Sequence, residues 1–450
     1  MKESHEVWKG GHQNTTEADR AALHVSTVGR SDVKAKRIIK ECQCVPVSVA
    51  RCYETVSSTD VGVSKGRPSS YFMLVHAITN SGMTGVGEMS DLPTDQISRF
   101  REASHLTGKH LEDVRNGTPL PGMNVAELSR EIESALIGQD PFDVKHVLHE
   151  FREAHATELA AGDVYYTKAA WAISMVMYDM MGKMLNAPVY ELFGGKIRDR
   201  LPISWVAYIR PAEFLEDEIE QRLSQGFQAF KLKVGGNADL DMERVGTVRR
   251  IAGPDVTIKV DAMASWTVDE AIEQIRQLEI HNLLGVETPV SYTEPSKTAA
   301  VRSAINVPVI EHIYNAAYGM GLWAEDAVDV LNIMPTMTNG MDEARNFLSL
   351  TEVMGQQAVL GSDVELGPGT AAALHLGVSS PAVTFPSDLV GPGMYADDVI
   401  TEPFQYDDGC LVVRDLPGLG VELDLQKARS WECTPESVSE VLDGGHGGNG

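Results

Sequence analysis

Two lysines stand two residues apart at the end of an apolar segment, in Phe230-Lys231-Leu232-Lys233-Val234. Residues two apart on a β-strand point to the same face of the sheet. Most lysines point into solvent, but an internal strand has no solvated edge. Leu232 and Val234 take the face toward the helices, so both lysines are expected to point inward. Packed near each other or near a metal, one of them could have a pKa low enough to act as a base.

An acidic residue ends each of the next two apolar segments. Ile258-Lys-Val-Asp261 ends on Asp261, and Leu284-Gly-Val-Glu287 ends on Glu287. A buried carboxylate is costly unless it is paired or binds a metal. One such acid could be a structural salt-bridge partner. Two on adjacent strands, beside two lysines, indicate a site for a hard cation, and carboxylate oxygens suit Mg²⁺.

The fifth segment of this kind, Pro308-Val-Ile-Glu311-His312, offers a third ligand. Glu311 is the better choice for Mg²⁺, whereas His312 suits a softer metal. We favour Glu311 and keep His312 as its rival. Together these groups predict a mechanism. The metal stabilises the enediolate of a carboxylate substrate while a lysine removes the α-proton.

These side chains must be held by a regular series of elements, and such a series follows residue 200. Eight strand-like segments are separated mostly by amphipathic helices. They are Ile203–Ile209, Ala229–Val234, Thr257–Asp261, Leu283–Glu287, Val307–His312, Val328–Met334, Gln357–Asp363 and Val383–Leu389. Eight βα units predict an α/β fold of the TIM-barrel type, in which functional residues lie at the C-terminal ends of strands. No Gly-x-Gly-x-x-Gly follows a first strand, which disfavours a Rossmann fold.

The remaining segments predict a second domain and two tails. Strand-like and helical patterns over residues 39–165 indicate an α+β domain, and the barrel occupies residues 166–390. Residues 391–440 are expected to return to the first domain. The polar residues 1–38 and the Gly-rich residues 441–450 are expected to be disordered tails.

The composition of this 450-residue chain limits the classes of molecule that it is expected to bind. Its formal net charge of −26 argues against binding nucleic acid, which rewards clustered lysine and arginine. An anionic substrate would need cations within its own site. No apolar run reaches the roughly 20 residues of a membrane span, and no secretory signal follows Met1. The five scattered cysteines are interpreted as reduced thiols of a cytoplasmic protein.

Taken as a set, these residues resemble the mandelate racemase and muconate lactonizing enzyme branch of the enolase superfamily. The resemblance extends from about Val47 to Asp424. It is carried by the entry into the barrel, which includes Pro188–Gly195, and by the lysine pair. Asp261 and Glu287 follow at nearly the spacing found in the family.

The resemblance implies a barrel covered by an α+β capping domain that the C-terminal segment completes. It also implies Mg²⁺ as cofactor, a small carboxylate as substrate and a homo-oligomer. Lys233 takes the role of base, with Lys231 beside it. Asp261 and Glu287 become metal ligands. Asp388 matches a family glutamate that hydrogen-bonds the enediolate.

Substrate choice in this family depends on loops of the capping domain. Here these loops correspond to Thr59–Tyr71, with Lys65 and Arg67. Ordinary solvated charge is the alternative explanation for each of these cations. Tyr208 in the barrel and Glu365 after the seventh strand are further candidate substrate contacts.

Several positions depart from the family pattern. Met263 and Thr288 replace an asparagine and a glutamine that usually accompany the first two ligands. Muconate-type enzymes have a second lysine on the sixth strand, where this chain reads Asn332-Ile-Met-Pro. Racemase-type enzymes have a histidine on the seventh strand, where this chain reads Gly-Ser-Asp363. A firm base is therefore predicted on one side of the substrate only.

This asymmetry leads to three hypotheses. A β-eliminating dehydratase of a hydroxy or sugar acid works with one lysine and an acid such as His312, and we favour it. The alternative is a racemase or epimerase with His312 or Asp363 as the second acid, or a cycloisomerase. The third hypothesis is a barrel that has lost catalysis and only binds.

Overall fold

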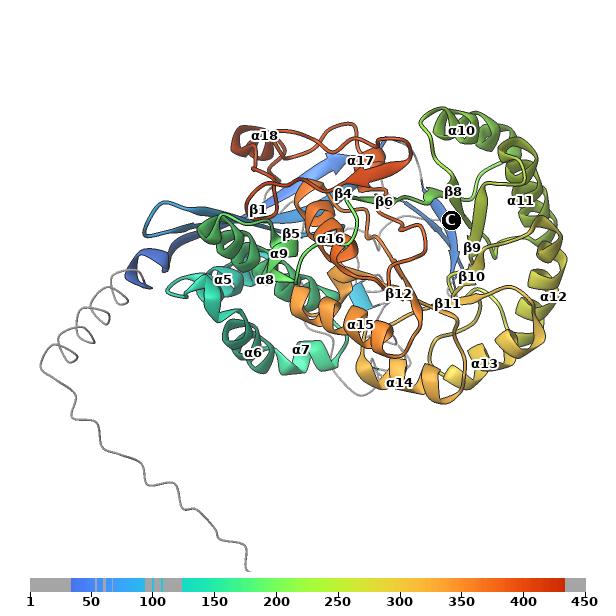
Figure 1. Ribbon diagram of the computed structural model, residues 1–450, viewed down its shortest axis with the longest axis horizontal. Helices are drawn as coiled ribbons and strands as arrows, with labels where there is room; N and C mark the ends of the chain where they lie inside the picture. The colour runs from blue at the N-terminus through green and yellow to red at the C-terminus, as the bar shows by residue number, and fades with distance from the viewer. Residues whose placement is uncertain are drawn as a thin grey trace, which may run out of the picture.

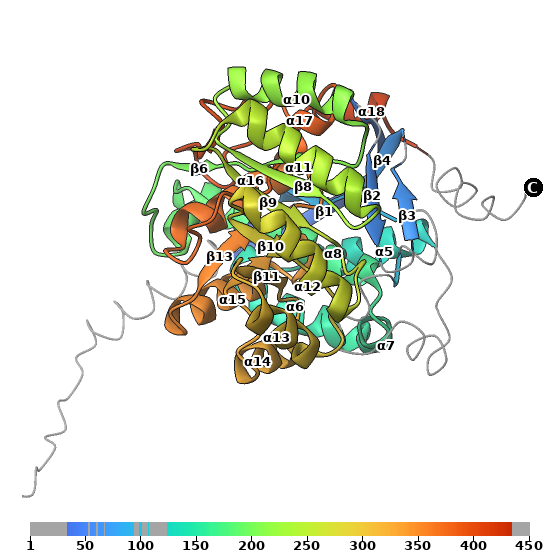
Figure 2. The same cartoon turned by 90° about the vertical axis from the view of Figure 1, so that its right-hand side faces the viewer.

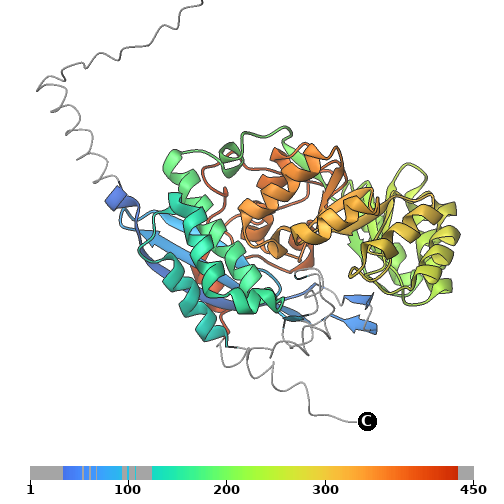
Figure 3. The ribbon, with the colours of Figure 1, turned by 90° about the horizontal axis from the view of Figure 1, so that it is seen from below.

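The structure, a computed structural model, describes residues 34–52, 55–59, 62–66, 68–93, 99–100, 107 and 124–433. An α+β unit built from the first part of the chain lies against a β/α barrel (Figure 1). Most of both predicted tails, and Arg67, lie outside the described residues. Seen from below, the later β/α units lie between the N-terminal unit and the earlier β/α units (Figure 3).

The N-terminal unit contains an antiparallel three-stranded sheet in the order β1-β4-β5. Its strands are β1 (Ile39–Ala50), β4 (Ser69–Thr79) and β5 (Thr84–Met89). The hairpin between β4 and β5 turns at Gly82, whose φ of +83° favours glycine. A separate hairpin joins β2 (Val56–Thr59) to β3 (Gly62–Lys65).

Helices pack beside this sheet: the first and the last of them contact its strands, and the two between pack on the last. They are α5 (Val125–Leu136), α6 (Val144–Ala154), α7 (Ala156–Ala160) and α8 (Val164–Leu185). Helix α8 is apolar on nearly all sides and almost entirely buried, since it lies between the sheet and the barrel. Gly87 lets it approach β5, because a Cβ at this position would lie 2.3 Å from the carbonyl oxygen of Ala172.

The barrel contains seven parallel strands in the sequential order β7 to β13. Figure 2 shows β8, β9, β10 and β11 following one another. They are β7 (Trp205–Ala207), β8 (Ala229–Lys233), β9 (Thr257–Asp261), β10 (Gly285–Glu287), β11 (Val309–His312), β12 (Val330–Ile333) and β13 (Gln357–Leu360). Each lies within a segment that the sequence predicts as a strand. The prediction of a TIM-type fold is confirmed.

The eighth predicted strand closes the barrel without forming a regular ladder. Val383 bridges Ala358 of β13 on one side, and Ser387 bridges Ile203 beside β7 on the other. Both bridges are parallel. Pro386 lies between them and has no N–H to donate, which explains why pairing is limited to isolated bridges.

Helices cover the outer face of the barrel. They are α10 (Ala212–Ser224), α11 (Ala238–Ala252), α12 (Val268–Leu278), α13 (Pro295–Ala304), α14 (Ala316–Ala324), α15 (Met341–Val353) and α16 (Gly367–Ser379). Thr267 and Glu270 form a capping box at the start of α12. Within the described ranges, no helix is both long and apolar enough to cross a membrane.

Shorter elements complete the fold. They are α9 (Val189–Leu192), β6 (Arg200–Pro202), α17 (Gly391–Met394), β14 (Cys410–Val412), α18 (Leu425–Ser430) and the 3₁₀ turns Pro141–Asp143, Glu279–His281 and Pro335–Met337. Strand β14 pairs with β6, which precedes β7 in the chain. The chain then returns to β1, where Glu432 bridges Val47.

Candidate active site

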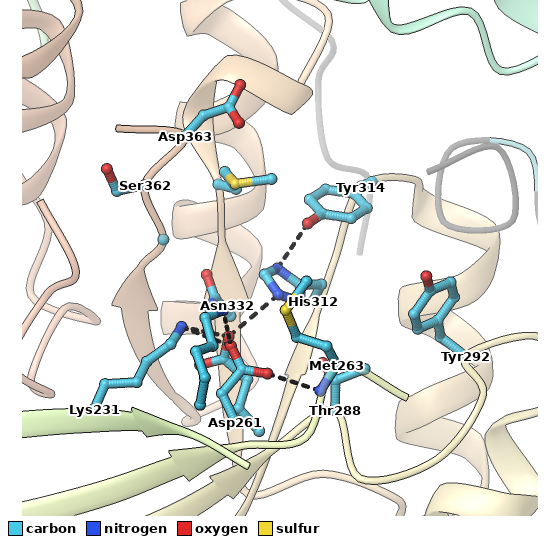
Figure 4. A pocket seen from close by; sticks show the side chains of 14 residues that line it. Lys231, Asp261, Met263, Thr288, Tyr292, His312, Tyr314, Asn332, Ser362 and Asp363 are labelled. Atoms are coloured by element: carbon cyan, nitrogen blue, oxygen red, sulfur yellow. Dashed lines mark hydrogen bonds and ion pairs between the residues drawn. The ribbon is translucent and has the colours of Figure 1, made fainter. Parts of the chain in front are cut away.

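A cavity of about 210 Å³ lies at the C-terminal ends of the barrel strands. Figure 4 shows side chains from successive strands converging on it. Six of the residues singled out from the sequence line it. These are Lys231, Lys233, Asp261, Glu287, His312 and Asp363. The position agrees with the general placement of active sites in barrels of this type.

Lys231 is a buried cation surrounded by carboxylates. Its Nζ lies 2.7 Å from Glu287 Oε1, 2.9 Å from Asp388 Oδ2 and 3.2 Å from Asp261 Oδ2. Burial by itself opposes the charge, but these carboxylates hold the pKa of Lys231 well above its usual range. Lys231 therefore remains an ammonium ion in this arrangement.

Lys233 differs from Lys231 although it lies on the same face of β8, as the spacing predicts. It is half-buried, and its Nζ lies 2.6 Å from a single carboxylate oxygen, Oδ2 of Asp261. The two residues are direct partners in the register of β8 and β9. Because it reaches the cavity with fewer partners, Lys233 is the better placed of the two lysines to exchange a proton.

Asp261 and Glu287 are neighbours in the register of β9 and β10, and both are buried. Asp261 Oδ1 accepts a hydrogen bond from the Met263 amide at 3.0 Å. Glu287 Oε2 has no hydrogen-bond partner among the described residues. Burial raises the pKa of Glu287, but Lys231 and His312 outweigh it and hold that pKa well below its usual range. The site thus contains an ionised carboxylate with one unpartnered oxygen.

The two candidates for a third ligand point to opposite faces of β11. Glu311 does not line the cavity; its Oε1 accepts from Thr288 Oγ1 at 3.0 Å and from the His312 amide at 2.8 Å. Burial raises the pKa of Glu311 to about 7. His312 lines the cavity, with its Nε2 3.3 Å from Glu287 Oε1. The structure therefore brings His312, and not the favoured Glu311, to the paired carboxylates.

Tyr314 holds the imidazole of His312 from the other side. Its hydroxyl lies 2.9 Å from His312 Nδ1, and the two rings are stacked with centroids 5.0 Å apart (Figure 4). Burial opposes protonation of His312, but Glu287 and Glu311 raise its pKa. The sequence reasoning missed Tyr314. Its position two residues after His312 was the available signal.

Asp388 lies behind Lys231 and does not line the cavity. Its two oxygens bind different lysines, Lys231 through Oδ2 and Lys259 through Oδ1, the latter at 2.7 Å. Lys259 is fully buried and was also missed, although it stands two residues before Asp261 on the same face of β9. Asp388 therefore touches the site through Lys231.

The opposite wall of the cavity contains Asp363. Burial raises the pKa of Asp363 to about 7, and its Oδ2 is paired with Lys168 of α8. Met334 lines the cavity from the segment where muconate-type enzymes have a second lysine. Glu365 lies outside the cavity lining, where its carboxylate accepts from Ser362 Oγ at 2.5 Å and from the Asp363 amide at 2.8 Å.

The structure places the predicted substrate contacts Lys65 and Tyr208 outside the lining of the cavity. Ser58 of the β2–β3 hairpin donates to the Gly235 carbonyl, which follows β8, at 3.2 Å. Lys65 ends this hairpin and is exposed. Tyr208 follows β7, and burial raises its pKa to about 12. Neither Lys65 nor Tyr208 lines the cavity, and Arg67 lies outside the described residues.

A divalent cation such as Mg²⁺ requires several oxygen donors directed at one point. Within the described ranges, no three His, Cys, Asp or Glu side chains converge tightly enough to hold a metal alone. The Lys231 ammonium lies among the carboxylates instead. The unpartnered Glu287 Oε2, beside Asp261 and His312, nevertheless supplies donors of the right chemistry, which water or substrate oxygens would complete.

Two family models match most of the chain. A family model for the mandelate racemase / muconate lactonizing enzyme N-terminal domain matches residues 60–194. A second, for the enolase C-terminal domain-like family, matches residues 215–428. The chain belongs to the mandelate racemase and muconate lactonizing enzyme branch of the enolase superfamily, as the sequence motifs predict.

Similar proteins include a racemase, a cycloisomerase and an epimerase. The chain is 27% identical over 357 residues to an N-succinyl-L-Arg/Lys racemase of Bacillus cereus, covering 78% of this chain and 88% of the relative. It is 24% identical to a muconate cycloisomerase of Rhodococcus opacus, and the match covers 68% of this chain and 81% of that relative. A dipeptide epimerase of Cytophaga hutchinsonii, solved with Mg and a dipeptide, has the same fold with a TM-score of 0.73 at 22% identity, covering 88% of this chain and 98% of that one.

Proposed function

We propose that this protein is a Mg²⁺-dependent isomerase that moves the proton next to the carboxylate of a small acid. The observation that carries this proposal is Lys233, which reaches the cavity beside the neighbouring carboxylates Asp261 and Glu287. The named relatives are a racemase, a cycloisomerase and an epimerase, and none is a dehydratase. They therefore favour the isomerase alternative over the dehydratase that the sequence suggested.

The donors that would hold Mg²⁺ are Asp261, Glu287 and His312, with the unpartnered Glu287 Oε2 as the strongest indication. The Mg named in the dipeptide epimerase structure supports the same cofactor here. When bound, the cation supplies positive charge that stabilises the enediolate formed at the substrate carboxylate.

The side chains of this chain supply the remaining steps. Lys233 accepts the α-proton on one face of the substrate. In a cycloisomerase the electron pair of that C–H bond becomes a C=C bond while the β-C–O bond of the lactone breaks and its electrons stay on the released carboxylate. The reverse reaction forms the C–O bond and returns the proton from Lys233. Lys231 stays charged because of its three carboxylate partners, so it donates hydrogen bonds to substrate oxygen and does not compete as the base. Met334 and Tyr314 line the cavity with apolar surface, which limits water around the reacting carbon.

Lys233 provides one base on one face of the substrate's α-carbon. This supports a reaction in which a single proton is transferred, as in a cycloisomerase. Met334 lies where a second lysine would serve the opposite face. A two-base epimerase is the second candidate, and Asp363 favours it. That carboxyl lines the opposite wall and has a pKa raised to about 7 by burial, so both of its protonation states are populated near neutral pH.

Proton exchange at the α-carbon in D₂O, followed by NMR with Mg²⁺ present, tests the proposal. The panel would contain muconolactone, dipeptides and N-succinyl amino acids of both configurations. We expect one class to exchange, and Lys233→Met to slow this exchange by about 10²–10⁴-fold. Lys297→Met is the matched control, since Lys297 lies on α13 away from the cavity, is partly exposed and pairs with Glu294.

The Asp363→Asn variant separates the two candidates. A two-base epimerase would retain exchange with one configuration only, whereas a one-base enzyme would show the same configurational preference as the unmodified protein. Absence of exchange across the whole panel, in a protein that also fails to bind Mg²⁺, would contradict the proposed function and favour a barrel that only binds.

A further inference from the structure

We propose that Asn332 is a substrate-binding residue, and that it selects acids whose α-substituent both donates and accepts hydrogen bonds, an amide or a hydroxyl group. The inference rests on the proposed function for the existence of the reaction. It goes beyond that function by assigning a polar contact on the wall opposite Lys233 and, with it, a class of substrate.

The side chain of Asn332 is a buried amide in the lining of the cavity, near the C-terminal end of β12. Neither its Oδ1 nor its Nδ2 has a hydrogen-bond partner among the described residues. Most buried polar groups in folded proteins are paired, because an unsatisfied one costs free energy. A bound molecule that supplies both a donor and an acceptor would remove this cost.

The neighbouring strands leave space for this amide. A Cβ at Gly361, which follows β13, would lie 2.5 Å from Oδ1 and 3.3 Å from Nδ2 of Asn332, so a residue without a side chain is needed there. On the other side, Asn332 is the register partner of His312 in β11. Figure 4 shows Asn332 among the side chains that converge on the cavity.

Asn332 and Lys233 lie on opposite sides of the barrel. Strand β8 is second and β12 is sixth in the closed order of eight strand segments. An acid that presents its α-proton to Lys233 therefore turns another substituent toward β12. Met334, two residues after Asn332, adds apolar surface to this wall, so Asn332 is the polar group of this segment that the substituent meets.

The chemistry of the amide defines the class of acid. Oδ1 needs a donor and Nδ2 needs an acceptor. A lactone or ester oxygen only accepts, so it leaves Oδ1 unpaired, whereas an N-acylated amino acid or a hydroxy acid supplies both kinds of group. A site that hydrogen-bonds a substrate N–H or O–H rejects the analogue that lacks it. This preference adds to the observation at Asp363 in favour of the epimerase candidate.

Three acids that differ only in the α-substituent test the inference. They are N-acetylalanine, lactate and O-acetyllactate, and titration calorimetry on the full chain with Mg²⁺ present would give their Kd values. We expect O-acetyllactate to bind about 10–100-fold more weakly than the tighter of the other two, which identifies the preferred substituent. Asn332→Leu should abolish this difference.

Thr336→Val is the matched control. It removes another buried polar atom that has no partner among the described residues, but Thr336 lies outside the cavity lining. The preference should remain in this variant.

A structural role for Asn332 predicts a different result. Asn332→Leu should raise the urea midpoint of the ligand-free protein, since it removes an unsatisfied buried amide. An amide that serves the fold would instead lower the midpoint and leave the preference in place. If Asn332→Leu does not fold, Gly361→Ala keeps the asparagine but displaces its amide, and should also reduce the preference.

The outcomes separate this inference from the proposed function. Equal Kd values for N-acetylalanine, lactate and O-acetyllactate, an unchanged preference in Asn332→Leu, or failure of all three acids to bind would overturn the assignment of Asn332. Each of these results leaves the isomerase standing as long as some acid of the wider panel exchanges its α-proton. Absence of exchange across that panel would overturn the proposed function.

Discussion

Lysines of the barrel differ in what surrounds their side chains. Lys231 and Lys259 are buried beside carboxylates, Lys233 is half-buried at the cavity, and Lys297 lies on a helix with its side chain 42% exposed. An ion pair in a dry interior is costly to break, because the remaining charge cannot regain its hydration. An ion pair in contact with solvent contributes little to the stability of the fold.

Lys259→Met should therefore destabilise the protein by about 3 kcal/mol, since it leaves Asp388 with Lys231 as its remaining lysine partner. The free energy of unfolding in urea is the measurement. Lys297→Met should change it by less than about 0.5 kcal/mol. Equal stability of the two variants would show that the Lys259–Asp388 pair contributes no net stabilisation.

Glu88 at the end of β5 joins two elements through its carboxyl group. It accepts from the amides of Leu366 and Gly369 at the start of α16, at 2.9 Å and 2.8 Å, and from Ser90 Oγ at 2.7 Å. Burial raises its pKa from 4.5 to about 8. The folded protein thus retains a proton that the unfolded chain releases above its ordinary pKa.

The sign of the pH dependence follows from this difference. Between about pH 4.5 and pH 8 the folded state binds more protons at Glu88, so this group stabilises the fold at low pH and loses that contribution as the pH rises towards 8. Glu88→Gln should flatten the fall in unfolding free energy by about 1.4 kcal/mol per pH unit across this window. Urea midpoints at several pH values would measure it; identical slopes in both proteins would contradict the prediction.

The contact between α8 and β5 depends on a residue without a side chain. A Cβ at Gly87 would lie 2.3 Å from the Ala172 carbonyl oxygen, so the helix would have to move away from the sheet. We expect Gly87→Ala to destabilise the protein by about 2–4 kcal/mol. Gly82→Ala, at a turn with open space but a positive φ, should cost only about 1 kcal/mol. Thermal unfolding compares the two, and a smaller effect at Gly87 would contradict this account.

The whole molecule has a formal net charge of −26, so its negative charges repel one another at neutral pH. Added salt screens this repulsion over about 10 Å at 0.1 M. The melting temperature at pH 7.5 should rise when NaCl increases from 20 mM to 500 mM. Near pH 5, close to the sequence pI of about 4.9, the same addition should have little effect. A lower melting temperature at high salt and pH 7.5 would show that attractive ion pairs dominate instead.

The sequence by itself determined most of the fold and half of the site. Strand periodicity located all seven ladder strands, and the two-residue spacing placed Lys231 and Lys233 on one face. Asp261 and Glu287 stood out because a carboxylate directly after an apolar strand needs a partner. These features are local, so they can be recognised from the sequence without knowledge of the neighbouring elements.

Only the tertiary structure decided which of Glu311 and His312 reaches the cavity. The two are adjacent in sequence, and a shift of one residue in a strand exchanges the inner and outer faces. The pairing of Lys259 with Asp388, and the stacking of Tyr314 on His312, likewise depend on how strands and loops meet in space. Alternation can be read from a sequence, but which face points inward is fixed by the neighbouring strands and by the helices that cover them.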